Sequence, residues 1–354
     1  MKTIKIGGAS GYWGDSAYAT KQLLEQGDVD YLVYDYLAEV TMSLLANARS
    51  KSDQLGYATD FVQQILKPNL QQIAERGVKV VANAGGVNLP ACQQAIQAIL
   101  DEQGIKLKVG VVSGDNLLAR ADELRAAGVT EMETAEPFPE KLASINAYLG
   151  AFPIAAALDA GADIVITGRV VDSATTLGVL IHQYQWSLDE YDKLAMGSLA
   201  GHLIECGCQV TGGNFTDWQD SCEGWADMGY PIIECEADGR FVVTKAEGTG
   251  GLVSELTVSE QLVYEIGDPQ AYFLPDVVCD FASVSLTQQG ENRVLVEGAI
   301  GYPATKQYKV SATHLNGYRA TYTQLLTGID VIKKAETTAD AILARCEKLF
   351  NELG

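Results

Sequence analysis

Apolar and polar positions in the first half of the chain follow two alternating patterns. Short apolar runs, typical of buried strands, are each followed by a longer stretch with the apolar spacing of an amphipathic helix. The predicted strands are Thr3–Gly7, Tyr31–Tyr36, Lys79–Asn83, Lys108–Ser113 and Asp163–Thr167, and the predicted helices are Ser16–Gln26, Asp60–Arg76, Pro90–Gln103, Asn116–Ala127 and Ile154–Ala160. This order predicts an α/β fold with a largely parallel sheet flanked by helices.

The pattern changes after about residue 185. A helical stretch at Leu194–Cys206 is followed by a glycine-rich and aromatic stretch at Gly207–Gly229. Alternating runs then predict a more antiparallel layer with strands at Tyr230–Glu236, Arg240–Lys245, Asp276–Thr287, Arg293–Gly298 and Gln307–Thr313, and a last helix is predicted over Asp330–Phe350. We therefore expect two domains: residues 1–185, an α/β domain with glycine-rich loops, and residues 186–354, an α+β domain that shares the active-site cleft.

Glycine is enriched in the chain, with 35 of 354 residues. Five glycines directly follow predicted helices, where a residue of positive φ ends the last turn. They are Gly27, Gly77, Gly104, Gly128 and Gly161. Other glycines gather in loops after predicted strands, which indicates turns where the backbone approaches a neighbour or a ligand closely.

The charge balance excludes one class of partner. Asp and Glu number 46 against 25 Lys and Arg, a formal net charge of −21, so the field repels nucleic acids. The apolar stretch Ala151–Thr167 is too short to cross a bilayer and the N-terminus lacks a signal-peptide core, so we expect a cytoplasmic protein with no membrane partner. Seven cysteines without a CxxC pair and three scattered histidines predict free thiols and no metal site.

Ligands of open α/β sheets bind beyond the carboxyl ends of the strands, which directs attention to the loops there. The candidate ligand-binding residues of the loops after the first and third strands are Ser10, Gly11, Asp15, Asn83, Gly85 and Gly86. The first loop has glycines at 8, 11 and 14, which matches neither the dinucleotide fingerprint nor a Walker loop. Two interpretations stay open for it: a cradle for an anion, or a tight turn with Asp15 as a helix cap.

Acidic residues and one arginine follow the other strands. Asp35, Asp60 and Asp115 are candidates for acid/base work, or for holding a divalent cation, which stays open as a ligand. Arg169 and Asp172 come directly after an apolar strand. Arg169 could grip a carboxylate or phosphate in a bidentate manner, and an internal ion pair with Asp172 is the equally weighted alternative.

The second half supplies the leading acid/base candidate, His202, with Glu205 beside it on the predicted helix. A buried histidine satisfied by Glu205 is the structural alternative. Ligand-binding candidates follow in two glycine-containing turns: Thr211, Gly212 and Gly213, then Lys245, Thr249 and Gly250. The second turn combines a cation with free backbone amides and could close over an anionic ligand.

These motifs together resemble the acyclic terpene utilisation family over nearly the whole chain. The matching segments are 11–15 (GYWGD), 30–39 (DYLVYDYLAE), 56–60 (GYATD), 83–86 (NAGG), 114–115 (GD), 167–172 (TGRVVD), 202–206 (HLIEC), 209–213 (QVTGG) and 248–251 (GTGG). The resemblance implies a setting in the catabolism of acyclic terpenes and related branched acids. In that setting the family stands beside biotin-dependent acyl-CoA carboxylases and enoyl-CoA hydratases.

Three hypotheses follow for the function. The leading one is an enzyme that acts on a branched acyl-CoA or its carboxylate by proton transfer, of hydratase, lyase or isomerase type, with no further cofactor identified. The second is a non-catalytic binding or assembly partner of acyl-CoA carboxylase subunits. The third is a nucleotide-dependent enzyme, for which Asp35 stands where a dinucleotide fold places its ribose-binding carboxylate. A homo-oligomer is expected in each case.

Overall fold

The apolar runs of the first half form parallel strands because both of their faces can be buried under helices. Nine strands make one sheet in the order β11-β12-β8-β7-β1-β2-β3-β6-β4. Its members are β1 Ile4–Gly8, β2 Tyr31–Tyr34, β3 Lys79–Ala82, β4 Val109–Val112, β6 Ile164–Thr167, β7 Pro231–Cys235, β8 Phe241–Lys245, β11 Ser285–Gly290 and β12 Arg293–Glu297. The five from the first half are mutually parallel, and β7, β8, β12 and β11 join by antiparallel pairing. The predicted mixed α/β fold with a parallel first half is confirmed.

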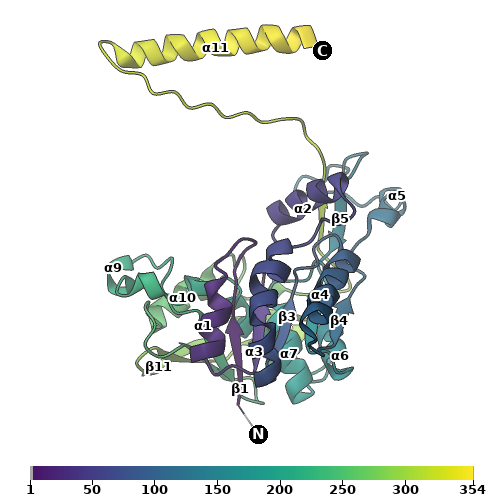
Figure 1. The fold of residues 1–354 in the computed structure, drawn as a ribbon, viewed down its shortest axis with the longest axis vertical. Helices are drawn as coiled ribbons and strands as arrows, with labels where there is room; N and C mark the ends of the chain where they lie inside the picture. The colour runs from purple at the N-terminus through teal and green to yellow at the C-terminus, as the bar shows by residue number, and fades with distance from the viewer. Residues whose placement is uncertain (1–2, 354) are drawn as a thin grey trace. The chain divides into compact units, whose positions relative to one another are not determined.

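This computed structural model describes residues 3–353, and Figure 1 labels its elements. The helices are α1 Tyr18–Gln26, α2 Glu39–Lys51, α3 Lys67–Arg76 with a π-helical turn Phe61–Leu66 before it, α4 Leu89–Gln103, α5 Ala121–Ala126, α6 Phe152–Asp159, α7 Ala174–Tyr184, α8 Tyr191–Ile204, α9 Trp218–Ser221, α10 Glu255–Val263 and α11 Val331–Leu353. None of them is both long and apolar enough for a membrane span, within the described residues.

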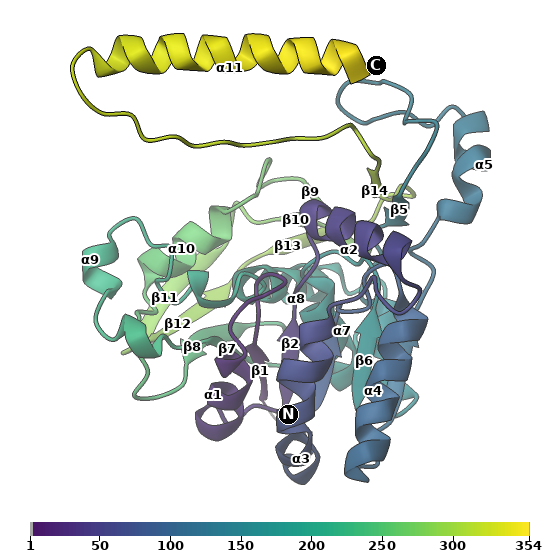
Figure 2. The ribbon, with the colours of Figure 1, turned by 45° about the horizontal axis from the view of Figure 1, so that its top comes forward.

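Helices cover both faces of the sheet, as Figure 2 shows for α1, α3 and α4 on one face and α7 and α8 on the other. Successive strand residues point to opposite faces, so each strand contributes to two cores. In β2, Leu32 packs in the core with α1 to α4, whereas Tyr31 and Val33 pack in the core with α6 to α8. The same alternation places Val80 and Val81 of β3 in different cores.

Two smaller sheets lie outside the large one. One consists of β9 Tyr272–Phe273, β10 Val277–Asp280 and β13 Ile300–Pro303, and the other pairs β5 Ser144–Ala147 with β14 Val310–Thr313. The chain divides into two compact units after Leu315. The first contains all three sheets, with strands from both sides of residue 185 in the largest, and the second contains the single helix α11.

Several element predictions were wrong in detail. The helix expected over Asn116–Ala127 is only a 3₁₀ turn at Leu118–Arg120 and the six-residue α5, because this segment has no buried apolar face to stabilise a longer helix. The strand expected over Asp276–Thr287 is two strands in different sheets, β10 and β11, separated by a turn closed from Val284 N to Phe281 O. Gly77, Gly104, Gly128 and Gly161 have the expected positive φ, whereas Gly27 has a φ of −86°.

Candidate functional site

The carboxyl ends of β1, β2 and β3 bring three predicted residues into contact. Asn83 follows β3, and its side-chain amide donates a hydrogen bond to the carboxyl of Asp35, which follows β2. The Asn83 side-chain oxygen accepts from the backbone N of Tyr36 at 2.7 Å. Ser10, after β1, donates its hydroxyl to the carbonyl oxygen of Asp35 at 3.2 Å. These bonds fix the Asp35 carboxyl at the edge of the sheet.

Burial raises the pKa of Asp35 well above its usual range. The nearby carboxylate of Asp172 raises this pKa further, whereas Arg169 and the hydrogen bond from Asn83 act in the opposite direction. An acid with a raised pKa keeps its proton at a pH where ordinary carboxyls have lost theirs. Asp35 can therefore donate a hydrogen bond or a proton.

Arg169 follows β6 and is 2% exposed. Its Nη1 donates to Asp172 Oδ1 at 2.7 Å, and its guanidinium lies over the ring of Tyr148 with 4.1 Å from Cζ to the ring centre. Burial acts to lower the pKa of Arg169, but Asp172 and other neighbours raise it overall. In the described part of the chain, Nε of Arg169 is buried without a hydrogen-bond partner. Arg169 is thus a charged group with a buried donor left to satisfy.

Asp115 holds the backbone in front of Arg169. Its Oδ2 accepts from the Arg169 N and from the Asn146 side chain, both at 2.8 Å. A Cβ on Gly168 would come within 2.3 Å of the same oxygen, so only glycine leaves room for this carboxylate. Burial raises the pKa of Asp115, and its hydrogen bonds act against that rise. Asp115 therefore fixes the backbone position of Arg169 through this hydrogen bond.

His202 lies on α8 and both of its ring nitrogens have partners. Nδ1 is 3.0 Å from Glu205 Oε1, and Nε2 is 2.9 Å from the carbonyl oxygen of Gln261. Because a carbonyl only accepts, Nε2 carries a hydrogen and donates it there. His202 is 2% exposed and has no free nitrogen to offer a ligand.

Burial raises the pKa of Glu205 to about 7, although His202 counteracts this rise. For His202, burial acts to lower the pKa, but the Glu205 carboxylate and the hydrogen bond to Gln261 raise it overall. The pair therefore holds a proton more tightly than the separate groups would. Asp172 raises the pKa of both Glu205 and Asp35, which links the α8 end to the residues after β2 and β6.

A protein-family model covers all of the residues described above, which lie at the carboxyl ends of the parallel strands and at the end of α8 and are called the cluster below. The model of the acyclic terpene utilisation family protein AtuA matches residues 4–353. The chain belongs to the AtuA family. Neither a curated protein nor a solved structure matches it. The family description places the chain in acyclic terpene utilisation and assigns no reaction to the cluster around Arg169.

The first glycine loop of this AtuA-family chain is filled by its own carboxylate. Asp15 accepts hydrogen bonds from the backbone N of Gly11 at 2.9 Å and of Ser16 at 2.6 Å, and from the hydroxyl of Tyr230 at 3.1 Å. Asp60 accepts from Trp13 Nε1 at 2.6 Å and so holds the tip of this loop. The backbone amides of Gly11 and Ser16 are thus occupied by the Asp15 carboxylate. This is the arrangement of a tight turn closed by its own side chain.

The remaining loops of the AtuA-family chain also make internal contacts. Gly85 N donates to Thr167 O at 3.0 Å, and Gly86 has a φ of 52°. Lys245 Nζ donates to the carbonyl oxygen of Thr249 at 2.5 Å, and burial lowers the pKa of Lys245. Three other predicted residues donate hydrogen bonds to carbonyl oxygens of the chain: Thr211 Oγ1 to Gly229 at 2.6 Å, Gly213 N to Cys208 at 2.9 Å and Gly250 N to Asp227 at 2.7 Å. Gly212 has a φ of 97°.

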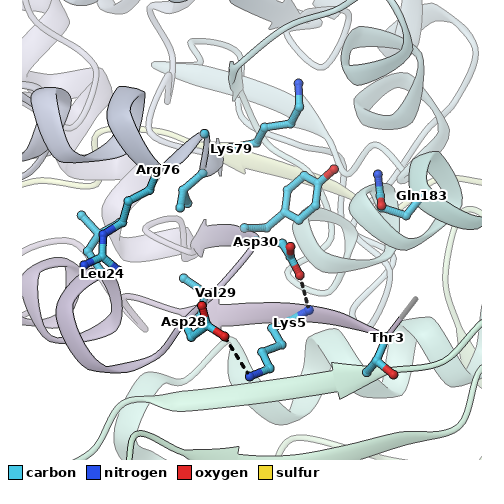
Figure 3. Close-up of a pocket in the computed structure, with 12 residues that line it drawn as sticks. Thr3, Lys5, Leu24, Asp28, Val29, Asp30, Arg76, Lys79 and Gln183 are labelled. Atoms are coloured by element: carbon cyan, nitrogen blue, oxygen red, sulfur yellow. Dashed lines mark hydrogen bonds and ion pairs between the residues drawn. The ribbon is translucent and has the colours of Figure 1, made fainter. Parts of the chain in front are cut away.

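Two hollows of the AtuA-family chain lie apart from the predicted site residues. The first, of about 510 Å³, is at the amino ends of β1, β2 and β3, and Figure 3 shows Lys5 between Asp28 and Asp30 in its wall. The second, of about 460 Å³, is lined mostly by apolar side chains such as Leu149 and Phe152. Leu149 N donates to the carbonyl oxygen of Arg169 at 3.3 Å, so this hollow adjoins the Arg169 loop through the backbone.

Sequence patterns missed several members of the cluster. Tyr148 and Asn146 belong to or follow β5, a strand of four residues that was not predicted. Gln261 comes from α10, far along the chain from His202. No group of three or more metal-ligating side chains in a suitable arrangement occurs between residues 3 and 353.

Proposed function

We propose that this protein is an enzyme of acyclic terpene or branched-chain acid catabolism that transfers a proton on an acyl-CoA thioester or the corresponding carboxylate. Hydratases, lyases and isomerases of this kind need no redox cofactor. The observation that carries the proposal is the Glu205 carboxyl, which is buried, has a pKa of about 7 and is held by His202. A general acid or base works best when its pKa lies near the working pH.

A second observation supports an anionic substrate. The unpartnered Nε of Arg169 is a buried charged donor, and leaving such a donor without a partner costs about 1–3 kcal/mol. A carboxylate or thioester oxygen would satisfy it. Asp35, with its raised pKa, lies in the same electrostatic neighbourhood and can donate to a developing negative charge without adding charge of its own.

The roles within the cluster follow from these contacts. Glu205 is the proposed proton-transfer group, and His202 is a positioning residue because it reaches the substrate only through Glu205. Asp172 orients Arg169, and Asp115 fixes the backbone of the same loop. The apolar hollow beside Leu149 is the proposed place for the branched hydrocarbon part of the substrate.

The test is exchange of the proton next to the carbonyl. Branched acyl-CoA thioesters and free acids are incubated with the protein in D₂O, and deuterium incorporation is followed by NMR. Glu205→Gln should lower the exchange rate by about 10² or more, the usual contribution of a general acid or base. Asp159→Asn is the matched control, because Asp159 holds His182 Nδ1 at 2.6 Å in an exposed pair and should keep the wild-type rate.

The variant His202→Asn distinguishes a positioning role of His202 from a loss of folded enzyme. Without His202, burial still raises the pKa of Glu205 but its opposing partner is gone, so the pH–rate profile should move to higher pH as the rate falls. Wild-type exchange in Glu205→Gln would overturn the role of Glu205. Co-purification with acyl-CoA carboxylase subunits, together with no exchange on any thioester or acid, would favour an assembly role instead.

A further inference from the structure

The helix α11 carries an apolar seam with a regular spacing. Its apolar positions alternate in steps of three and four residues from one end of the 23-residue helix to the other. They are Ile332, Ala335, Ala339, Ile342, Cys346, Leu349 and Leu353. This is the spacing at which one helix packs against another as a coiled coil, and the seven positions of the seam give seven consecutive layers.

The seam has no cover within its own unit. None of the α11 side chains is buried, and Ile332, Leu349 and Leu353 are exposed. Leu343 and Phe350 stand directly beside the seam and are more than 60% exposed, which widens the apolar face. Single helices are marginal in water, and most of their stability in proteins comes from packing of the apolar face. A packing partner is therefore required.

Charge favours a second copy of this chain as that partner. Residues 316–354 contain five basic and five acidic side chains, so the whole net charge of −21 lies on residues 1–315. Two copies of such a chain repel each other over most of their surfaces. The α11 unit is the neutral part, where two copies can approach without this repulsion. An identical seam on each copy is also self-complementary, as a two-fold interface requires.

We propose that α11 pairs with α11 of a second copy of this chain through the seam that runs from Ile332 to Leu353. The proposal concerns assembly and is independent of the reaction proposed above. It assigns Ile342, at the middle of the seam, and Leu349, in its last third, to the interface. It assigns Ala344 and Asn351, which point away from the seam by helical spacing, to the outer face.

Mass measurement across a dilution series tests the proposal on the full chain. Wild type should sediment at twice the chain mass of 37.9 kDa. The double variant Ile342→Lys with Leu349→Lys should sediment as a monomer, because it places two charges in the seam. The double variant Ala344→Lys with Asn351→Lys adds the same charge on the outer face and should stay dimeric.

Two results would overturn the proposal. A wild type that is monomeric at about 100 μM would mean that the seam is covered by its own chain or by another protein. A seam variant that remains dimeric would place the interface between copies elsewhere on the molecule. The near-ultraviolet circular dichroism of both variants should match wild type, which shows that residues 1–315 are still folded.

Discussion

The two ends of the parallel strands carry ion pairs of very different kinds. At the amino ends, Lys5 pairs with Asp28 at 3.4 Å and with Glu234 at 3.8 Å, with the Lys5 side chain 34% and the Asp28 side chain 94% exposed. At the carboxyl ends, Arg169 pairs with Asp172 at 2.7 Å, with 3% of the arginine side chain and 35% of the Asp172 side chain exposed. Each pair joins a basic side chain to a carboxylate, but the two cations differ greatly in their exposure to water.

This difference determines what each end can do. Water solvates the charges at the amino ends, so those pairs contribute little to stability and each partner is replaceable. At the carboxyl ends, burial raises the pKa of Asp35 and Glu205. Arg169 is also buried, so its charge must be stabilised by neighbouring side chains rather than by water. Buried, mutually dependent charges therefore distinguish the carboxyl ends of these strands from the amino ends, and such charges are typical of functional sites.

Removal of one cation at each end should give the largest contrast. Arg169→Met leaves Asp172 without its buried counter-charge and should lower the free energy of unfolding by about 3–5 kcal/mol. Lys5→Met removes a partly exposed partner and should cost about 1 kcal/mol or less. Denaturant titration of both variants measures these losses. Equal losses would contradict the comparison, because they would mean that the Arg169 charge is not specially dependent on its partners.

Sequence patterns identified the sheet but not every residue at the carboxyl ends of its strands. The strand ends were predictable because Asp35, Asn83 and Arg169 directly follow long apolar runs, and parallel strands end at a common edge. Tyr148 was not predictable, because β5 contains the polar residues Ser144 and Asn146 and so lacks the continuous apolar run that marks four-residue strands such as β2 and β6. The hydrogen bond between His202 and the carbonyl oxygen of Gln261 was not predictable either. It depends on the packing of α10 on α8, a tertiary contact with no local signal in the sequence.

The glycine loops show the opposite limitation. Their sequence predicted close backbone approach, which occurs at Gly11 against Cys206 and at Gly168 against Asp115. It did not reveal what approaches. In both places the neighbour belongs to the chain itself, because a glycine-rich turn is equally suited to a ligand and to another part of the backbone or a side chain.

Two glycines allow a second comparison of the sheet ends. Gly168→Ala would place a Cβ 2.3 Å from an oxygen of Asp115, so the loop must shift and the contact with Arg169 N is lost. We expect a loss of about 3 kcal/mol, at the upper end of the cost of overpacking. Gly77→Ala has no atom within 4 Å of its Cβ and only its φ of 67° to oppose it, which costs about 1 kcal/mol.

Thermal unfolding of the two glycine variants measures this difference, with Gly168→Ala the lower in Tm. A Gly168→Ala variant that is no less stable than Gly77→Ala would mean that the loop before Arg169 can move freely. The buried cluster would then not depend on the position of Asp115.

The pH dependence of stability gives a contrast similar in size to that of the two glycines, and the most direct view of Glu205. The folded protein holds a proton on Glu205 up to about pH 7, whereas the unfolded chain releases it near the ordinary value of 4.5. Stability from this group is therefore full below about pH 4.5 and falls as pH rises through 7, by about 1.4 kcal/mol per pH unit. Glu205→Gln should remove that slope from denaturant titrations at pH 5, 6 and 7. Asp28→Asn, which changes a 94% exposed carboxylate at the other end of the strands, should keep the wild-type slope. A slope in Glu205→Gln equal to that of wild type would mean that Glu205 does not hold the proton on which its proposed role depends.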